Sequence, residues 1–172
     1  MSGSDGASFL EVRRGQVEAI LAKYPAERKQ AAVMPLLFLA QQTEGRVTEQ
    51  AVAAIARLLE LDPTQVGSLV GFYTLYSFRP LGRYRMQICT DLPCALRGAE
   101  SFSREVCRRL GVRPGEKTGD GSITVEEVMC LAACHRAPVF QVQDADGLHY
   151  HEAQTVEQAM EWADAVRGRR PA

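Results

Sequence analysis

Four cysteines, arranged as two close pairs, constrain this chain more than any other feature of its sequence. Cys89 and Cys94 are spaced C-x4-C, Cys130 and Cys134 are spaced C-x3-C, and 35 residues separate the pairs. Two thiol pairs brought together by folding can surround one soft metal centre. The spacing differs from the cysteine runs of bacterial-type and plant-type ferredoxins, and from the repeated C-x2-C of a zinc ribbon. It therefore indicates a thiolate centre of another kind.

Composition excludes several classes of protein. The chain has 172 residues, 46% of them hydrophobic, and a formal net charge of −1, so no overall field attracts nucleic acid or an acidic membrane. No apolar stretch reaches the roughly twenty residues that cross a bilayer. The N-terminus lacks the basic and then apolar pattern of a secretory signal. We therefore expect a reducing compartment, where clustered thiols bind metal or do redox chemistry more often than they form disulfides.

The first 80 residues contain no cysteine and predict a small helical bundle. Apolar residues at helical spacing indicate helices over residues 9–22 and 35–43. Thr48 is a candidate N-cap for a third helix, and Asp62-Pro63 opens a fourth that runs to about Tyr73. A Pro/Gly-containing linker over residues 77–83 follows.

The remaining residues change character and predict the order β-α-β-β-β-α. Strands are expected over residues 84–89, 123–129, 139–143 and 148–151, and helices over residues 96–110 and after a capping box formed by Thr155 and Gln158. The fold class is therefore α/β (α+β). A helical domain over residues 1–80 precedes a thioredoxin-like domain over residues 81–172, whose mixed sheet is flanked by helices. Cys107 lies on the apolar side of the 96–110 helix and is expected to be an inert core residue.

The two cysteine pairs are expected in loops at the ends of secondary-structure elements. Cys89 ends the first strand, and Cys94 is predicted to start the helix that follows. Backbone N–H groups at a helix start lack intrahelical partners and favour an anionic centre, such as a [2Fe–2S] cluster held by four thiolates. Structural zinc and two disulfides remain alternatives. A dithiol enzyme of the thioredoxin type would require C-x-x-C instead.

The histidines are expected to have secondary roles. His135 directly follows Cys134, and its imidazole can donate a hydrogen bond to a cluster sulfur, although a Rieske centre uses two histidines as ligands. His149 and His151 are expected at the surface. The sequence contains no dinucleotide-binding glycine motif, no Walker motif and no recognisable catalytic triad, so no catalytic residue is assigned.

The cysteine motifs resemble those of a known family. The segments Cys89–Gly98 (CTDLPCALRG) and Cys130–Val139 (CLAACHRAPV) are similar to the two ligand motifs of the thioredoxin-like [2Fe–2S] subunit of NADH dehydrogenase. In bacteria this enzyme is respiratory complex I (NADH-quinone oxidoreductase). Residues 34–37 and 71–82 are similar to the helical prefix and linker of that family. Homologous subunits serve NAD-dependent formate dehydrogenases and hydrogenase diaphorases, which remain alternatives, as does a four-cysteine zinc interaction module.

The resemblance implies that Cys89, Cys94, Cys130 and Cys134 ligate one [2Fe–2S] cluster. It implies an electron-transfer subunit, without a substrate site of its own, that docks on a flavoprotein subunit binding FMN and NADH and carrying a [4Fe–4S] cluster. The expected location is cytoplasmic, at the periphery of the inner membrane through the larger respiratory complex, with no membrane insertion and no nucleic-acid partner. The family often has glycine where Ala132 or Ala133 stands here.

Overall fold

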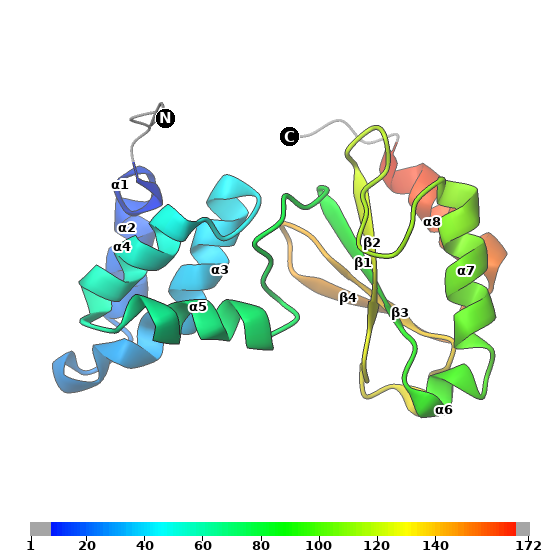
Figure 1. Cartoon of the computed structure of the whole chain (residues 1–172), viewed down its shortest axis with the longest axis horizontal. Coiled ribbons are helices and arrows are strands. Elements are labelled where there is room, and N and C mark those ends of the chain that lie inside the picture. The colour runs from blue at the N-terminus through cyan, green and yellow to red at the C-terminus, as the bar shows by residue number, and fades with distance from the viewer. Residues whose placement is uncertain (1–7, 168–172) are drawn as a thin grey trace. The chain divides into compact units, whose positions relative to one another are not determined.

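The computed structural model describes residues 8–167. The chain divides into two compact units, Met1–Pro80 and Leu81–Ala172 (Figure 1). The described part of the first unit is helical, and the second combines helices with a four-stranded sheet. None of the helices between residues 8 and 167 has the length and apolar character that a membrane-crossing segment needs.

The first unit packs short helices around an apolar core. Its elements are α1 (Phe9–Val12), α2 (Arg14–Leu21), the 3-10 helix η1 (Ala26–Ala32), α3 (Val33–Glu44), α4 (Glu49–Leu59) and α5 (Pro63–Phe72). Both predicted helix starts are confirmed. The Thr48 hydroxyl accepts a 3.1 Å hydrogen bond from the Ala51 amide, and the Asp62 carboxylate accepts a 2.7 Å bond from the Thr64 amide. The helix η1 was not predicted.

The single helix predicted over residues 9–22 is wrong. Arg13 leaves the helical region (φ −113°, ψ 26°) and separates α1 from α2. Gly15, a poor helix former, follows the break. The break shifts the helical register, so Val12, an apolar residue in helical spacing with Phe9, is 60% exposed whereas Phe9 is buried.

The second unit has the predicted order of strands, with additional short helical turns. Its elements are β1 (Tyr84–Cys89), α6 (Leu92–Ala95), α7 (Ala99–Leu110), β2 (Ile123–Val128), the 3-10 turn η2 (Cys134–Arg136), β3 (Phe140–Gln143), β4 (Leu148–His151) and α8 (Val156–Arg167). The capping box before α8 is confirmed. The Thr155 amide donates to the Gln158 side chain at 2.9 Å, and the Gln158 amide donates to the Thr155 hydroxyl at 3.2 Å.

The sheet is mixed, in the order β2-β1-β3-β4, with β1 parallel to β2 and the other pairs antiparallel. Figure 1 shows α7 and α8 together on one side of this sheet. The core between the sheet and the helices contains Met86 and Ile88 from β1, Val106 from α7 and Ala163 from α8. Burial of these side chains holds β1 at the centre of the unit.

Buried polar side chains on the alternate positions of the strands form a hydrogen-bonded network. The Glu126 carboxylate accepts from Arg85 Nε at 2.8 Å and from Gln87 Nε2 at 3.1 Å. Gln141 Nε2 donates to the Gln87 side-chain oxygen, and Arg85 Nη1 donates to the Gln143 side-chain oxygen at 3.3 Å. The network links the edge strand β2 to β1 and β3. It also provides hydrogen-bond partners for polar groups whose burial would otherwise destabilise the fold.

Candidate metal centre

The two cysteine loops leave the sheet at the same edge. β1 and β2 run parallel, and Cys89, the last residue of β1, pairs in register with Val128, the last residue of β2. The Thr90 amide donates to the Val128 carbonyl at 3.1 Å, which extends this pairing into the loops. Cys130 follows two residues after Val128. Figure 1 shows α6 and the loop after β2 at the same end of the unit. Parallel pairing thus unites thiol pairs that are far apart in the sequence.

The first loop folds into a short helix that carries Cys94. The Asp91 carboxylate caps this helix by accepting a 2.9 Å bond from the Leu92 amide. Cys94 was predicted to start the long helix, and this prediction is wrong. It lies inside the four-residue helix α6, and α7 begins only after Gly98, whose left-handed backbone (φ +86°) separates the two helices. Ala99, the first residue of the long helix, is nevertheless buried in the same apolar cluster as Cys94.

The second loop has an unusual backbone. Cys130 (φ +32°) and Ala132 (φ +59°) both have positive φ, and the Ala137–Pro138 peptide bond is cis. The loop is held from outside by the segment between β4 and α8. The Ala153 amide donates to the Arg136 carbonyl at 2.6 Å, and the Gln154 amide donates to the Pro138 carbonyl at 3.0 Å. These bonds fix the end of the turn that carries Cys134.

The left-handed backbone of Ala132 leads to a paired prediction. Ala132→Gly is expected to raise the free energy of unfolding by up to about 1 kcal/mol, because glycine adopts this conformation without steric cost. Ala133 has negative φ (−116°), so Ala133→Gly is expected to lower the free energy of unfolding by about 0.5–1 kcal/mol through the greater entropy of the unfolded chain. Urea unfolding of both variants measures the difference. Equal destabilisation by both would contradict the prediction.

Three of the four thiols lie together. Cys89 and Cys94 are fully buried in a small apolar cluster with Leu131, Ala133 and Val139 from the second loop and its continuation. Burial, followed by hydrogen bonds and charge interactions with Cys89 and Cys134, raises the pKa of the Cys94 thiol to about 12. Cys94 therefore carries its proton at neutral pH in the metal-free protein, and metal binding has to displace that proton.

Cys130 differs from the other three because its side chain is exposed. No group of three or more His, Cys, Asp or Glu side chains within residues 8–167 is arranged to hold a metal ion as the side chains stand. A [2Fe–2S] cluster shares its four thiolates between two irons, so its ligands are spread more widely than those around a single ion. An exposed side chain can also change rotamer at low cost. The donor set of four thiols on two adjoining loops fits a soft iron centre.

The other candidate residues have separate environments. Cys107 is buried in α7, as predicted, and burial raises the pKa of its thiol. The side chain of His135 is exposed. His149 is exposed and lies 3.4 Å from the Asp144 carboxylate. The surface prediction is wrong for His151, which is half-buried and stacks on Phe140 with ring centroids 4.5 Å apart.

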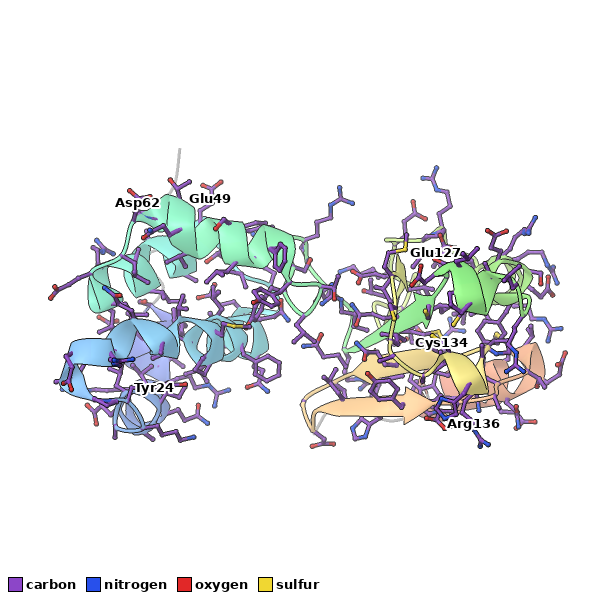
Figure 2. All side chains as sticks on the ribbon, turned by 90° about the horizontal axis from the view of Figure 1, so that it is seen from below. Tyr24, Glu49, Asp62, Glu127, Cys134 and Arg136 are labelled. Atoms are coloured by element: carbon purple, nitrogen blue, oxygen red, sulfur yellow. The ribbon has the colours of Figure 1, made fainter. Side chains whose placement is uncertain are left out.

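Arg97 is a residue of this site that the sequence reasoning missed. Its Nη1 donates a 3.1 Å hydrogen bond to the His135 carbonyl in the second loop. In the sequence, only its position three residues after Cys94 indicated that Arg97 belongs to the site. Figure 2 labels Cys134 and Arg136 on the second loop; Cys134 is half-buried, whereas the Arg136 side chain is 56% exposed.

The fold and the thiols define an α/β protein with a thiolate site at one edge of its sheet. The profile of the thioredoxin-like [2Fe–2S] ferredoxins matches residues 17–167, and the chain belongs to this family. It is 43% identical over 136 residues to NADH-quinone oxidoreductase subunit 2 of Thermus thermophilus, with 79% of this chain and 75% of that protein covered. It is 35% identical over 161 residues to an NADH-quinone oxidoreductase subunit of Rickettsia bellii, with 93% and 94% covered.

A solved structure shares the fold. The NAD+-reducing [NiFe]-hydrogenase in the air-oxidized state aligns with a TM-score of 0.63 and 18% sequence identity. The alignment covers 79% of this chain and 23% of the hydrogenase chain. At this level of identity, the likeness concerns the fold alone.

Proposed function

We propose that this chain is an electron-transfer subunit of an NADH-quinone oxidoreductase, with one [2Fe–2S] cluster held by Cys89, Cys94, Cys130 and Cys134. The convergence of two cysteine loops at one edge of the sheet is the observation that carries this proposal. Residues 81–172 form the cluster-bearing domain, and residues 1–80 form a separate helical domain. The names of the relatives and the family to which the chain belongs support the assignment.

Each part of the site has a distinct role in this proposal. When bound, the cluster supplies one-electron transfer. Cys89 and Cys94 hold it from a fully buried position, where Leu131 and Val139 keep water away. The bonds from Ala153 and Gln154 restrain the loop of Cys134, which limits rearrangement when the charge of the site changes. Cys130 is exposed and would hold the cluster on the side from which a partner can approach.

The proposed partner is a flavoprotein subunit that binds FMN and NADH and carries a [4Fe–4S] cluster, within a larger respiratory complex at the inner membrane. Three exposed apolar side chains beside the cysteine loops support a docking surface there. Leu92 is 68% exposed, Leu96 is 81% exposed and Met129 is 74% exposed. Apolar groups of this size are suited to burial in a protein interface.

The composition of the anaerobically purified protein tests the proposed cofactor. We expect two irons and two inorganic sulfides per chain, and an electron paramagnetic resonance signal that develops only after reduction. A colourless protein that contains one zinc ion per chain would contradict the proposal and would favour a structural metal site.

The docking surface leads to a second paired prediction. Leu96→Asp is expected to weaken binding of the flavoprotein subunit about tenfold or more, because an aspartate cannot be buried in an apolar interface without a cost of at least about 1.4 kcal/mol. Leu148→Asp, which alters a 45% exposed leucine on β4, is the matched control and should bind normally. Titration of the purified flavoprotein with each variant measures both affinities. Similar losses of affinity in the two variants would show that Leu96 is not part of the interface.

A further inference from the structure

We propose that Arg97 is a positioning residue that ties the two cysteine loops together and places a positive charge beside the cluster site. This inference rests on the proposed function, because it concerns the same four thiols. It adds a residue that neither ligates metal nor belongs to the apolar docking surface.

The contacts of Arg97 connect both cysteine turns. Its backbone amide donates to the Cys94 carbonyl at 3.0 Å, which closes the turn after α6. Its guanidinium Nη1 donates to the carbonyl of His135, the residue that follows Cys134, at 3.1 Å. One residue is therefore hydrogen-bonded to the turn of Cys94 and to the turn of Cys134. Separation of the loops would break the second of these bonds.

The backbone of the first loop keeps Arg97 in this place. The Gly98 amide donates to the Ala95 carbonyl at 2.9 Å, and the left-handed conformation of Gly98 (φ +86°) turns the chain into α7. Arg97 consequently lies in the turn between α6 and α7 and is not part of either helix. Its backbone is hydrogen-bonded to one cysteine turn and its side chain to the other. Arg97 can therefore act as a clamp, by which we mean a residue that holds the two turns together.

Within the described part of the chain, no carboxylate lies close enough to pair with the charge of Arg97. Among residues 8–167, no Asp or Glu forms an ion pair with Arg97, whereas Arg136 pairs with Glu152 at 3.3 Å. A cluster held by four thiolates gains negative charge on reduction, so a nearby cation stabilises the reduced form. Arg97 is exposed, so solvent and salt reduce the effect without removing it.

Four variants of the full chain, reconstituted anaerobically with iron and sulfide, test these two roles. Arg97→Met keeps the aliphatic stem and removes both the hydrogen bond and the charge. Arg97→Gln removes the charge and keeps a donor, and Arg97→Lys keeps the charge. Arg104→Met is the matched control, because Arg104 is an exposed arginine on α7 with no ion pair among the described residues and no hydrogen bond to either cysteine turn.

Two measurements separate the clamp from the charge. For Arg97→Met, we expect iron release to a chelator to be about threefold faster, because the variant loses one hydrogen bond that contributes roughly 0.7 kcal/mol. At a fixed potential, the ratio of reduced to oxidised cluster, measured by electron paramagnetic resonance, is expected to fall about threefold. Arg97→Lys should restore this ratio, Arg97→Gln should not, and Arg104→Met should release iron at the wild-type rate.

The possible outcomes are distinct. Wild-type rates and ratios in Arg97→Met would overturn the inference while leaving the cluster assignment intact. An equal change in Arg104→Met would also overturn it, because the effect would then not depend on the bond between the two cysteine turns. A wild-type chain that binds no iron would overturn the proposed function itself. If circular dichroism shows that Arg97→Met does not fold, the ratio in Arg97→Gln decides the charge role, and iron release from a further variant, Arg97→Ala, which has no donor, decides the clamp role.

Discussion

The Cys89→Ser and Cys134→Ser variants are expected to retain less than about a tenth of the wild-type iron, because a serine hydroxyl is a hard, weakly acidic donor that replaces a thiolate poorly in a soft metal site. Cys89 is buried in contact with Cys94, and Cys134 approaches Cys94 from the other loop. In the proposed cluster, removing either one would leave an iron without one of its ligands. Iron and sulfide analysis after anaerobic purification measures the loss.

Cys107→Ser is the matched control for this prediction. Cys107 is also buried, at 5% exposure, but it lies in α7 with Ser103 and Glu127 as its neighbours. We expect two irons per chain in this variant. Iron loss in Cys107→Ser comparable to that in Cys89→Ser would refute the assignment of Cys107 as a core residue that does not bind the cluster.

Cys130→Ser decides whether the exposed cysteine is the fourth ligand. The structure unites Cys89, Cys94 and Cys134 and leaves Cys130 exposed at the start of the second loop. If Cys130 completes the set, Cys130→Ser is expected to lose iron as extensively as Cys89→Ser. Full iron content in Cys130→Ser would mean that another donor occupies the fourth position.

Glu126→Ala is expected to lower the free energy of unfolding by about 3 kcal/mol, because it removes the carboxylate of a largely buried ion pair. Glu126 Oε2 lies 2.8 Å from Arg85 Nε, and the two side chains are only 20% and 6% exposed. The same oxygen also accepts from Gln87. The substitution therefore removes two hydrogen bonds from the polar network of the sheet.

Glu116→Ala provides the comparison for a surface ion pair. Glu116 pairs with Arg113 at 2.7 Å, but these side chains are 45% and 85% exposed. Pairs of this kind contribute little to stability. Urea unfolding of the metal-free protein should therefore show a large loss for Glu126→Ala and little change for Glu116→Ala. Equal losses would show that burial does not set the strength of the Arg85–Glu126 pair.

Local sequence signals predicted most elements of the second unit. The strands over residues 84–89 and 148–151 have the predicted bounds, and β2 and β3 each differ by one residue at one end. Alternating side chains and turn residues act over a few positions, so a short window contains the information. The same holds for the caps at Thr48, Asp62 and Thr155, whose hydrogen bonds reach only two or three residues.

The predicted helix boundaries were wrong where the backbone conformation of one residue interrupts a longer periodic pattern of apolar residues. Arg13 interrupts a continuous amphipathic stretch, and Gly98 separates Cys94 from the long helix. The periodicity of apolar residues continues across such a break, so periodicity alone does not reveal it, and the only local sign is a glycine at each break, Gly15 and Gly98. His151 was misplaced for a related reason, since its stacking on Phe140 depends on the pairing of β3 with β4.

The chemistry of the site could be predicted from the amino-acid sequence: four thiols, their division into two pairs, and the family motif around them. Three features could be found only in the folded chain: the parallel pairing of β1 with β2 carries both pairs to one edge of the sheet, Arg97 bridges the loops, and Cys130 is the exposed member of the four thiols. Residue type fixes what a side chain can bind, whereas proximity between distant segments comes from strand pairing and core burial, which no local pattern encodes.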